Sequence, residues 1–248
     1  IKSVNELETL NNIQNWPYII KTSTFGYDGK GQIIVNNYNE LIAAHSKLKS
    51  DNFVLEKKVE LKKEVSQVAA AYHDEIIYLP ISENIHINNI LHKSLVPADI
   101  NEGSSEQIKD ITKEIIRELN YKGIICIEFF IDMYDNILVN EIAPRTHNSG
   151  HYSIEGCNIS QFEHQVRIIT NQKPENSTLK SPSVMINLLG DLWEKSSPNF
   201  DGISKGVFIH LYNKIIPKKG RKMGHITVMN KNLQSANNIA EEKFKELG

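Results

Sequence analysis

The sequence predicts an α+β fold in which antiparallel hairpins are more prominent than βαβ units. The first observation behind this fold class is that apolar, β-prone runs come in adjacent pairs. Residues 64–72 and 76–81 flank the polar turn His73-Asp74-Glu75, and residues 124–132 and 137–142 form a second pair. The second observation is that helical periodicity is confined to separate segments, such as residues 105–120.

The other elements follow from local signals. Ser3-Val4-Asn5-Glu6 has the form of a capping box and opens a helix that runs to about Ile13. The polar segment 171–182 contains two prolines and is the expected linker. In chain order, the remaining expected elements are strands at 16–22 and 32–36, a helix at 39–49, a strand at 53–59, a helix at 160–169, strands at 183–189, 206–213 and 225–229, and a helix from about residue 233.

The composition is that of an ordinary soluble globular protein. Of 248 residues, 40% are apolar and 23% charged, which suits one large domain or two smaller ones. A net charge of −2 excludes bulk attraction to nucleic acid or to an anionic membrane. Two cysteines, Cys126 and Cys157, give no disulfide framework, and no apolar run reaches the length of a membrane span. We therefore expect a cytoplasmic protein without nucleic-acid or membrane partners.

The stretch from Asn140 to His151 carries the densest set of chemically active side chains. It follows a short apolar run, and Pro144 and Gly150 make a continuous helix there unfavourable. The sequence therefore predicts a strand that opens into a polar loop, where chemistry usually lies. His147 and His151 are four residues apart, but the missing helix argues against a zinc pair.

In the expected hairpin, one acidic residue of this stretch lies opposite an acidic residue of the preceding strand. If Asp132 and Ile137 flank a four-residue loop, Glu128 lies directly opposite Glu141. Opposed like charges are destabilising unless they are neutralised, and Mg²⁺ is usually held by one or two carboxylates together with substrate phosphates. The alternative is that one glutamate meets an arginine or faces solvent, and a one-residue bulge would break the register.

Three further segments suit the binding of a nucleotide or phosphate. The glycine-rich run from Gly26 to Gly31 lies between two strands, so a hairpin flap over phosphates fits it better than a P-loop; a simple tight turn is the alternative. The segment from Glu56 to Val59 and the nearby Glu64 could contact adenine and ribose, or could be surface charge. The third segment contains Lys214, Arg221 and Lys222, which suit a phosphate ester as well as a solvated basic turn.

Together these segments resemble the ATP-grasp ligases, and specifically the 5-(carboxyamino)imidazole ribonucleotide synthetases of purine biosynthesis. The resemblance covers almost the whole chain. It implies an ATP-grasp fold with antiparallel sheets at residues 1–172, divided into a lid at 1–80 and a central part at 81–172. A small β-rich C-terminal domain at 173–248 would follow. The resemblance rests on Lys21-Thr22 with Gly26 to Gln32, Glu64-Val65-Ser66, Pro80 to His86, Asn140 to His151, Ser160-Gln161-Phe162-Glu163 and Gly220 to His225.

The resemblance implies that ATP phosphorylates bicarbonate to carboxyphosphate, which carboxylates aminoimidazole ribonucleotide. It also implies ATP and Mg²⁺ as cofactors and a homodimer. Glu128 and Glu141 would hold Mg²⁺. The positions that would bind ATP are Lys21, Gly26, Tyr27, Asp28, Gly29, Lys30, Gly31, Gln32, Glu56, Lys57, Lys58, Val59, Glu64, His86, Asn140 and Glu141. The catalytic positions facing bicarbonate and the ribonucleotide would be Arg145, His147, Asn148 and Ser149. The ribonucleotide phosphate would be bound by Lys214, Arg221 and Lys222.

The chain departs from the family pattern in three ways. Phe25 stands where the family has a glycine, which is expected to stiffen the flap. Ala71 stands where the family has an arginine, so one ligand contact is expected to be lost. The family also carries an N-terminal domain, typically on the order of 100 residues, before the first helix here. Two alternatives follow: a truncated ATP-binding module without turnover, or a relative such as a formate-dependent glycinamide ribonucleotide transformylase.

Overall fold

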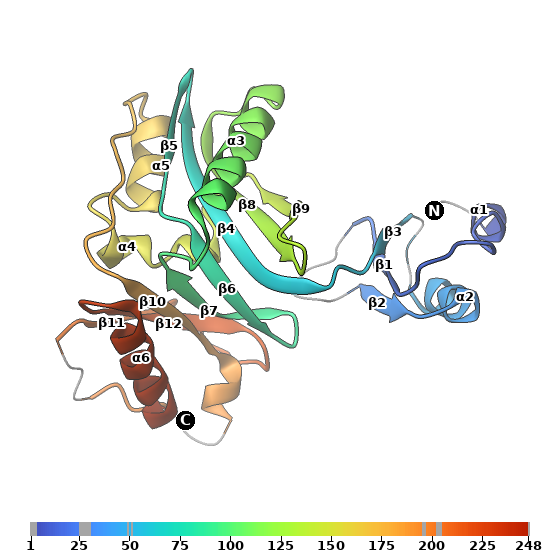
Figure 1. Cartoon of the computed structure of the whole chain (residues 1–248). Coiled ribbons are helices and arrows are strands. Elements are labelled where there is room, and N and C mark those ends of the chain that lie inside the picture. Colours follow the sequence, from blue (N-terminus) through green and yellow to red (C-terminus); the bar gives the residue numbers. More distant parts are fainter. Residues whose placement is uncertain are drawn as a thin grey trace. The chain divides into compact units, whose positions relative to one another are not determined.

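A computed structural model of the chain describes residues 4–24, 31–48, 50, 52–194, 197–201 and 205–247. The chain forms two compact units (Figure 1). The smaller unit consists of residues 1–60 with 88–90, and the larger of residues 61–87 with 91–248.

The smaller unit contains a three-stranded antiparallel sheet with strand order β2-β1-β3. Its strands are β1 (Tyr18–Thr22), β2 (Gln32–Val35) and β3 (Phe53–Lys57), and its helices are α1 (Val4–Glu8) and α2 (Tyr38–Lys47). Ile20, Leu41 and Phe53 pack in its core. The first helix is shorter than predicted: it ends at Glu8, and residues 9–12 form turns.

The larger unit contains a nine-stranded sheet with strand order β11-β12-β10-β7-β6-β4-β8-β9, and β5 pairs with β4. The pairs β4–β8, β8–β9, β7–β10 and β10–β12 are antiparallel. The strands are β4 (Leu61–Tyr72), β5 (Glu75–Tyr78), β6 (Ser82–Ile87), β7 (Ile90–Val96), β8 (Gly123–Asp132), β9 (Ile137–Ala143), β10 (Ser183–Leu189), β11 (Val207–Leu211) and β12 (Lys222–Met229).

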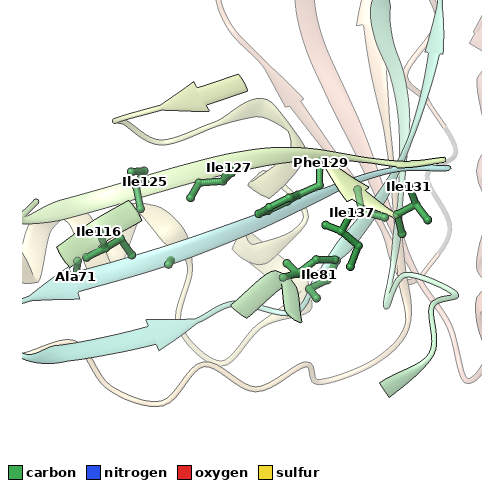
Figure 2. Close-up of a cluster of buried hydrophobic side chains, with 11 residues drawn as sticks. Ala71, Ile81, Ile116, Ile125, Ile127, Phe129, Ile131 and Ile137 are labelled. Atoms are coloured by element: carbon green, nitrogen blue, oxygen red, sulfur yellow. The ribbon is translucent and has the colours of Figure 1, made fainter. Parts of the chain in front are cut away.

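Helices cover both faces of this sheet. On one face, α3 (Glu102–Glu118) packs through Ile108 and Ile116 against alternate residues of β4 and β8 (Figure 2). On the other face, α5 (Gln161–Ile169) packs against the opposite set. Helix α6 (Leu233–Leu247) lies on the same side as α3, where it covers Val184 and Ile186 of β10 and Ile226 of β12. Ala71 is completely buried on the α3 side, so we expect no ligand contact from this position. The short helices are η1 (Asn148–Gly150), α4 (Ser153–Gly156) and η2 (Gly190–Trp193).

The predicted α+β fold with antiparallel sheets is confirmed. The hairpin of β6 and β7 was not predicted, although its turn residues Asn88 and Asn89 both have positive φ, which is typical of a two-residue hairpin turn. Strand β10, which follows the predicted boundary at residue 172, continues the sheet by pairing with β7. The domain boundaries at residues 80 and 172 stay predictions. No described helix is long and apolar enough to cross a membrane.

Candidate functional site

One face of the larger sheet changes from apolar to polar along its strands. Alternate residues of a strand share a face, and on the α5 side β4 runs from Val68 to Ser66 and then Glu64. On β8 the same face carries Cys126 and then Glu128, because Glu128 pairs with Ser66. Helix α5 packs on the apolar end of this face. Its polar end therefore brings carboxylates together beside the loop that follows β9.

The predicted pairing of Glu128 with Glu141 is confirmed, but it arises from a register different from the expected one. Near the turn, Ile131 pairs with Ile137, one residue out of the predicted register. A β-bulge at Asn140 then takes up the extra residue and restores the pairing of the two glutamates. Bulges of this kind often re-aim side chains next to active sites.

Glu128 is buried close to two other carboxylates, those of Glu141 and Glu64. Burial is the main reason that its pKa rises to about 7; the charge of His86 opposes the rise, and those of Glu141 and Glu64 add to it. The charge of Lys222 also lowers the pKa of Glu128, although less strongly. A divalent cation next to Glu128 and Glu141 would relieve the repulsion and favour the charged form of both carboxylates.

Glu64 and His86, both predicted to contact the nucleotide, form an ion pair. Glu64 Oε2 lies 2.7 Å from His86 Nδ1. The two residues are diagonal neighbours on adjacent strands, because Glu64 pairs with Asn84. Burial lowers the pKa of His86, but the hydrogen bond and charge of Glu64, with the charge of Glu128, outweigh burial and raise it above its ordinary value.

His147 is held as a neutral hydrogen-bond donor beside Glu128. The backbone N–H of Ser149 donates to His147 Nδ1, so the neutral ring carries its proton on Nε2, which lies 3.5 Å from Glu128 Oε1. Ser149 Oγ lies 2.8 Å from the same Nδ1 and 3.7 Å from Cys126 Sγ. Burial, followed by the charge of Arg145, lowers the pKa of His147 to about 3.

The other three residues predicted for catalysis differ in exposure. Ser149 is completely buried, and a direct contact with bicarbonate stays a prediction. The amides of Asn148 and Asn187 on β10 bond to each other in both directions, at 3.0 and 2.6 Å. Arg145 is exposed, and its Nη1 donates to the carbonyl oxygen of Thr146.

The three cations predicted to bind phosphate lie close enough to repel one another. Burial and the charges of Arg221 and Lys222 lower the pKa of Lys214. Lys214 Nζ donates to the carbonyl oxygen of Lys222 at 2.6 Å, and Arg221 Nη1 donates to that of Ile216 at 2.8 Å. Because the charge of Lys222 also acts on Glu128, the basic cluster and the carboxylate pair are parts of one electrostatic site.

The smaller unit holds the remaining predicted nucleotide residues. Lys21 Nζ and Glu56 Oε2 form an ion pair at 2.5 Å across β1 and β3. Gln32 pairs with Lys21 across β1 and β2, and the carbonyl oxygen of Gly31 accepts from Thr22 N. Lys57 and Lys58 are exposed, and Val59 is half-buried. The predicted positions Gly26, Tyr27, Asp28, Gly29 and Lys30, and the departure at Phe25, lie outside the described residues.

Several polar residues of the site had no predicted role. Gln161 bonds to both His147 and His151. His210 and His225 are cross-strand partners whose rings stack with centroids 4.6 Å apart. One available signal was Asn187, because an amide within an otherwise apolar strand needs a polar partner when it is buried.

Comparisons with known proteins show what the chain is similar to. Residues 1–162 match the family model described as the ATP-grasp domain, and residues 183–239 match the phosphoribosylaminoimidazole carboxylase C-terminal domain. The chain is 38% identical over 232 residues to the N5-carboxyaminoimidazole ribonucleotide synthase of Staphylococcus saprophyticus, covering 93% of this chain and 62% of that protein.

Two solved structures are also similar. The N5-carboxyaminoimidazole synthetase from Staphylococcus aureus, complexed with ADP, has a TM-score of 0.87 and 38% identity over 98% of this chain and 65% of that one. The synthase from Aspergillus clavatus, in complex with ADP and 5-aminoimidazole ribonucleotide, has a TM-score of 0.85 and 27% identity over 99% and 66%. The chain thus spans about two thirds of the length of these relatives. The family model that matches residues 1–162 establishes that the chain belongs to the ATP-grasp domain family.

Proposed function

We propose that the protein is an ATP-dependent carbon–nitrogen ligase of purine biosynthesis. It would carboxylate 5-aminoimidazole ribonucleotide with bicarbonate, giving 5-(carboxyamino)imidazole ribonucleotide, ADP and phosphate. The observation that carries the proposal is the Glu128–Glu141 pair, which lies within electrostatic reach of the basic cluster. The two carboxylates would bind the magnesium ion of a magnesium nucleotide. The basic cluster would bind a phosphate ester.

Mg²⁺ fits the donor set at Glu128 and Glu141. Two carboxylates and the amide oxygen of Asn140 are the oxygen ligands that this ion prefers, and substrate phosphates usually complete its shell. Within the described ranges no three His, Cys, Asp or Glu side chains are grouped as metal ligands, which favours a shell that depends on the nucleotide. When bound, Mg²⁺ would neutralise charge on the phosphates.

The reaction would proceed in two displacements. An oxygen of bicarbonate attacks the γ-phosphorus of ATP, and the bond to the ADP oxygen breaks, giving carboxyphosphate. The exocyclic amine of the ribonucleotide then attacks the carboxyl carbon, phosphate leaves, and the amine loses its proton. Arg145 and the neutral Nε2–H of His147 would hold the carboxylate oxygens by hydrogen bonds, and Asn148 would fix their orientation. Catalysis of this kind is mostly positioning and charge stabilisation.

We assign the remaining predicted residues to parts of the two substrates, taking each unit of the chain separately. In the larger unit, Glu64 and His86 would contact the ribose side of the nucleotide, and Lys214, Arg221 and Lys222 would bind the phosphate of the ribonucleotide. In the smaller unit, Lys21 with Gly31 and Gln32 would contact ATP phosphates, and the segment from Glu56 to Val59 would bind adenine. A homodimer and a cytoplasmic location also belong to the proposal, and a sedimentation measurement tests the dimer.

The test is phosphate release from ATP with bicarbonate and aminoimidazole ribonucleotide. The proposal expects release only when both substrates and Mg²⁺ are present. Magnesium-dependent ATP binding without release would favour an ATP-binding module that does not turn over. Release that requires formate and glycinamide ribonucleotide would favour the transformylase alternative.

A further inference from the structure

Gln161 is the first residue of α5 and is completely buried. All three hydrogen bonds of its side chain go to the segment 147–151. The backbone N–H of His147 donates to Gln161 Oε1 at 2.9 Å, and Gln161 Nε2 donates to the carbonyl oxygen of His147 at 2.8 Å. Nε2 also lies 3.0 Å from His151 Nδ1. The side-chain amide of Gln161 therefore forms hydrogen bonds with the backbone N–H and C=O of His147 and with the ring of His151.

The orientation of this amide follows from its partners. A backbone N–H can only donate and a carbonyl can only accept, so the oxygen of Gln161 must face His147 N and the nitrogen must face His147 O. The nitrogen is a donor only, and the nearby Nδ1 of His151 must therefore accept. The proton of a neutral His151 ring then lies on Nε2.

The surroundings of His151 keep its ring neutral. Burial, together with the charges of Lys222 and His210, lowers its pKa to about 4, although a hydrogen bond between the ring and the backbone of His147 opposes this shift. The rings packed around it are Phe162 at 5.4 Å, Tyr212 at 6.1 Å and His225 at 5.1 Å between centroids.

The support for Gln161 is rigid. Ser160 caps α5 through a capping box with Glu163, and the hydroxyl of Ser153 accepts from Gln161 N while donating to the carbonyl oxygen of Gly150. A β-carbon at Gly150 would lie 2.8 Å from Gln161 Oε1, so the loop and the amide are in direct contact. The amide is thus fixed by the start of a helix rather than by the loop that it holds.

We propose that Gln161 is a positioning residue, whose amide fixes the backbone at His147 and the Nε2–H tautomer of His151. Its importance for turnover rests on the proposed ligase function, because His147 acts there as a donor. Its effect on His151 does not depend on that function. Position matters because a displacement on the order of 1 Å can cost about 100-fold in rate.

Heteronuclear NMR of the imidazole nitrogens tests the tautomer in the unaltered protein, with the His151 signals assigned from a His151→Gln sample. Nδ1 of His151 is expected to carry no proton and Nε2 to carry one. A proton on Nδ1 would overturn the assignment. This measurement stays valid even if the protein carries out no ligase reaction.

Gln161→Glu changes one NH₂ group into an oxygen and keeps the shape of the side chain. The carboxylate can still accept from His147 N, but it cannot donate to His147 O or to His151 Nδ1. We expect Nδ1 of His151 to gain a proton and kcat to fall about 10- to 100-fold, with the KM for ATP little changed. Gln165→Glu is the matched control on the same helix, because Gln165 uses its oxygen only to accept from Ile124 N. Full kcat in Gln161→Glu, or an unprotonated Nδ1 there, would refute the positioning role.

Discussion

Replacing Glu128 with glutamine should change how the stability of the magnesium-free protein depends on pH. Burial raises the pKa of Glu128 from 4.5 to about 7. Between these values the native state holds a proton that the unfolded state releases. The stabilisation from Glu128 is therefore complete below pH 4.5 and is lost as pH rises through 7. Glutamine does not titrate, so the stability of the variant does not fall with pH for this reason.

The size of the effect follows from the shift. One pKa unit corresponds to about 1.4 kcal/mol. A single group with these two pKa values loses about 2 to 3 kcal/mol of stability between pH 5 and pH 8. The free energy of unfolding of Glu128→Gln, relative to the unaltered protein, should rise by that amount over the same interval.

Urea denaturation without Mg²⁺, in steps from pH 5 to pH 8, measures this difference. Glu114→Gln on α3 is the matched control, because the side chain of Glu114 is exposed and the same chemical change there removes no buried carboxylate. A flat difference for Glu128→Gln would refute the argument that Glu128 is buried among like charges.

Three other changes test separate parts of the account. Glu141→Gln should abolish magnesium-dependent turnover while the circular dichroism spectrum stays unchanged; full activity would contradict the metal assignment. Gly224→Ala should lower the free energy of unfolding by about 1 to 3 kcal/mol, because a β-carbon there would lie 2.4 Å from the carbonyl oxygen of His210. Gly103→Ala, whose β-carbon would meet only Asn101 Oδ1 at 3.4 Å, is the control and should be neutral or stabilising. Ser160→Ala removes the capping box of α5 and should cost about 1 kcal/mol in urea denaturation, and no loss would contradict the capping role.

The sequence predicted the carboxylate pair for a reason that was partly wrong. It assumed a uniform hairpin register, whereas the structure has a one-residue shift near the turn and a compensating bulge at Asn140. The register near the turn depends on the hydrogen bonds between Asp132 and Asn136, which the residue pattern does not reveal. The pattern gives no clear signal for the bulge either. The glutamates face each other because the two deviations cancel.

Local patterns predicted the elements better than the contacts between them. The helix at residues 160–169 and the hairpin of β8 and β9 follow from residues close in sequence. The hydrogen bonds between the side chain of Gln161 and the backbone of His147 connect the start of a helix to the loop before it. The periodicity of the sequence does not predict such a contact. The stacking of His210 on His225 likewise depends on the register of β11 with β12.

The central claim is that the acidic pair and the basic cluster bind two different substrates of one ligase reaction. The most direct measurement is steady-state phosphate release with Mg²⁺, ATP and bicarbonate, with and without aminoimidazole ribonucleotide, combined with detection of the carboxylated product. The account predicts release that depends on the ribonucleotide and equals product formation. Release that ignores the ribonucleotide, or ATP binding with no release at all, would contradict it.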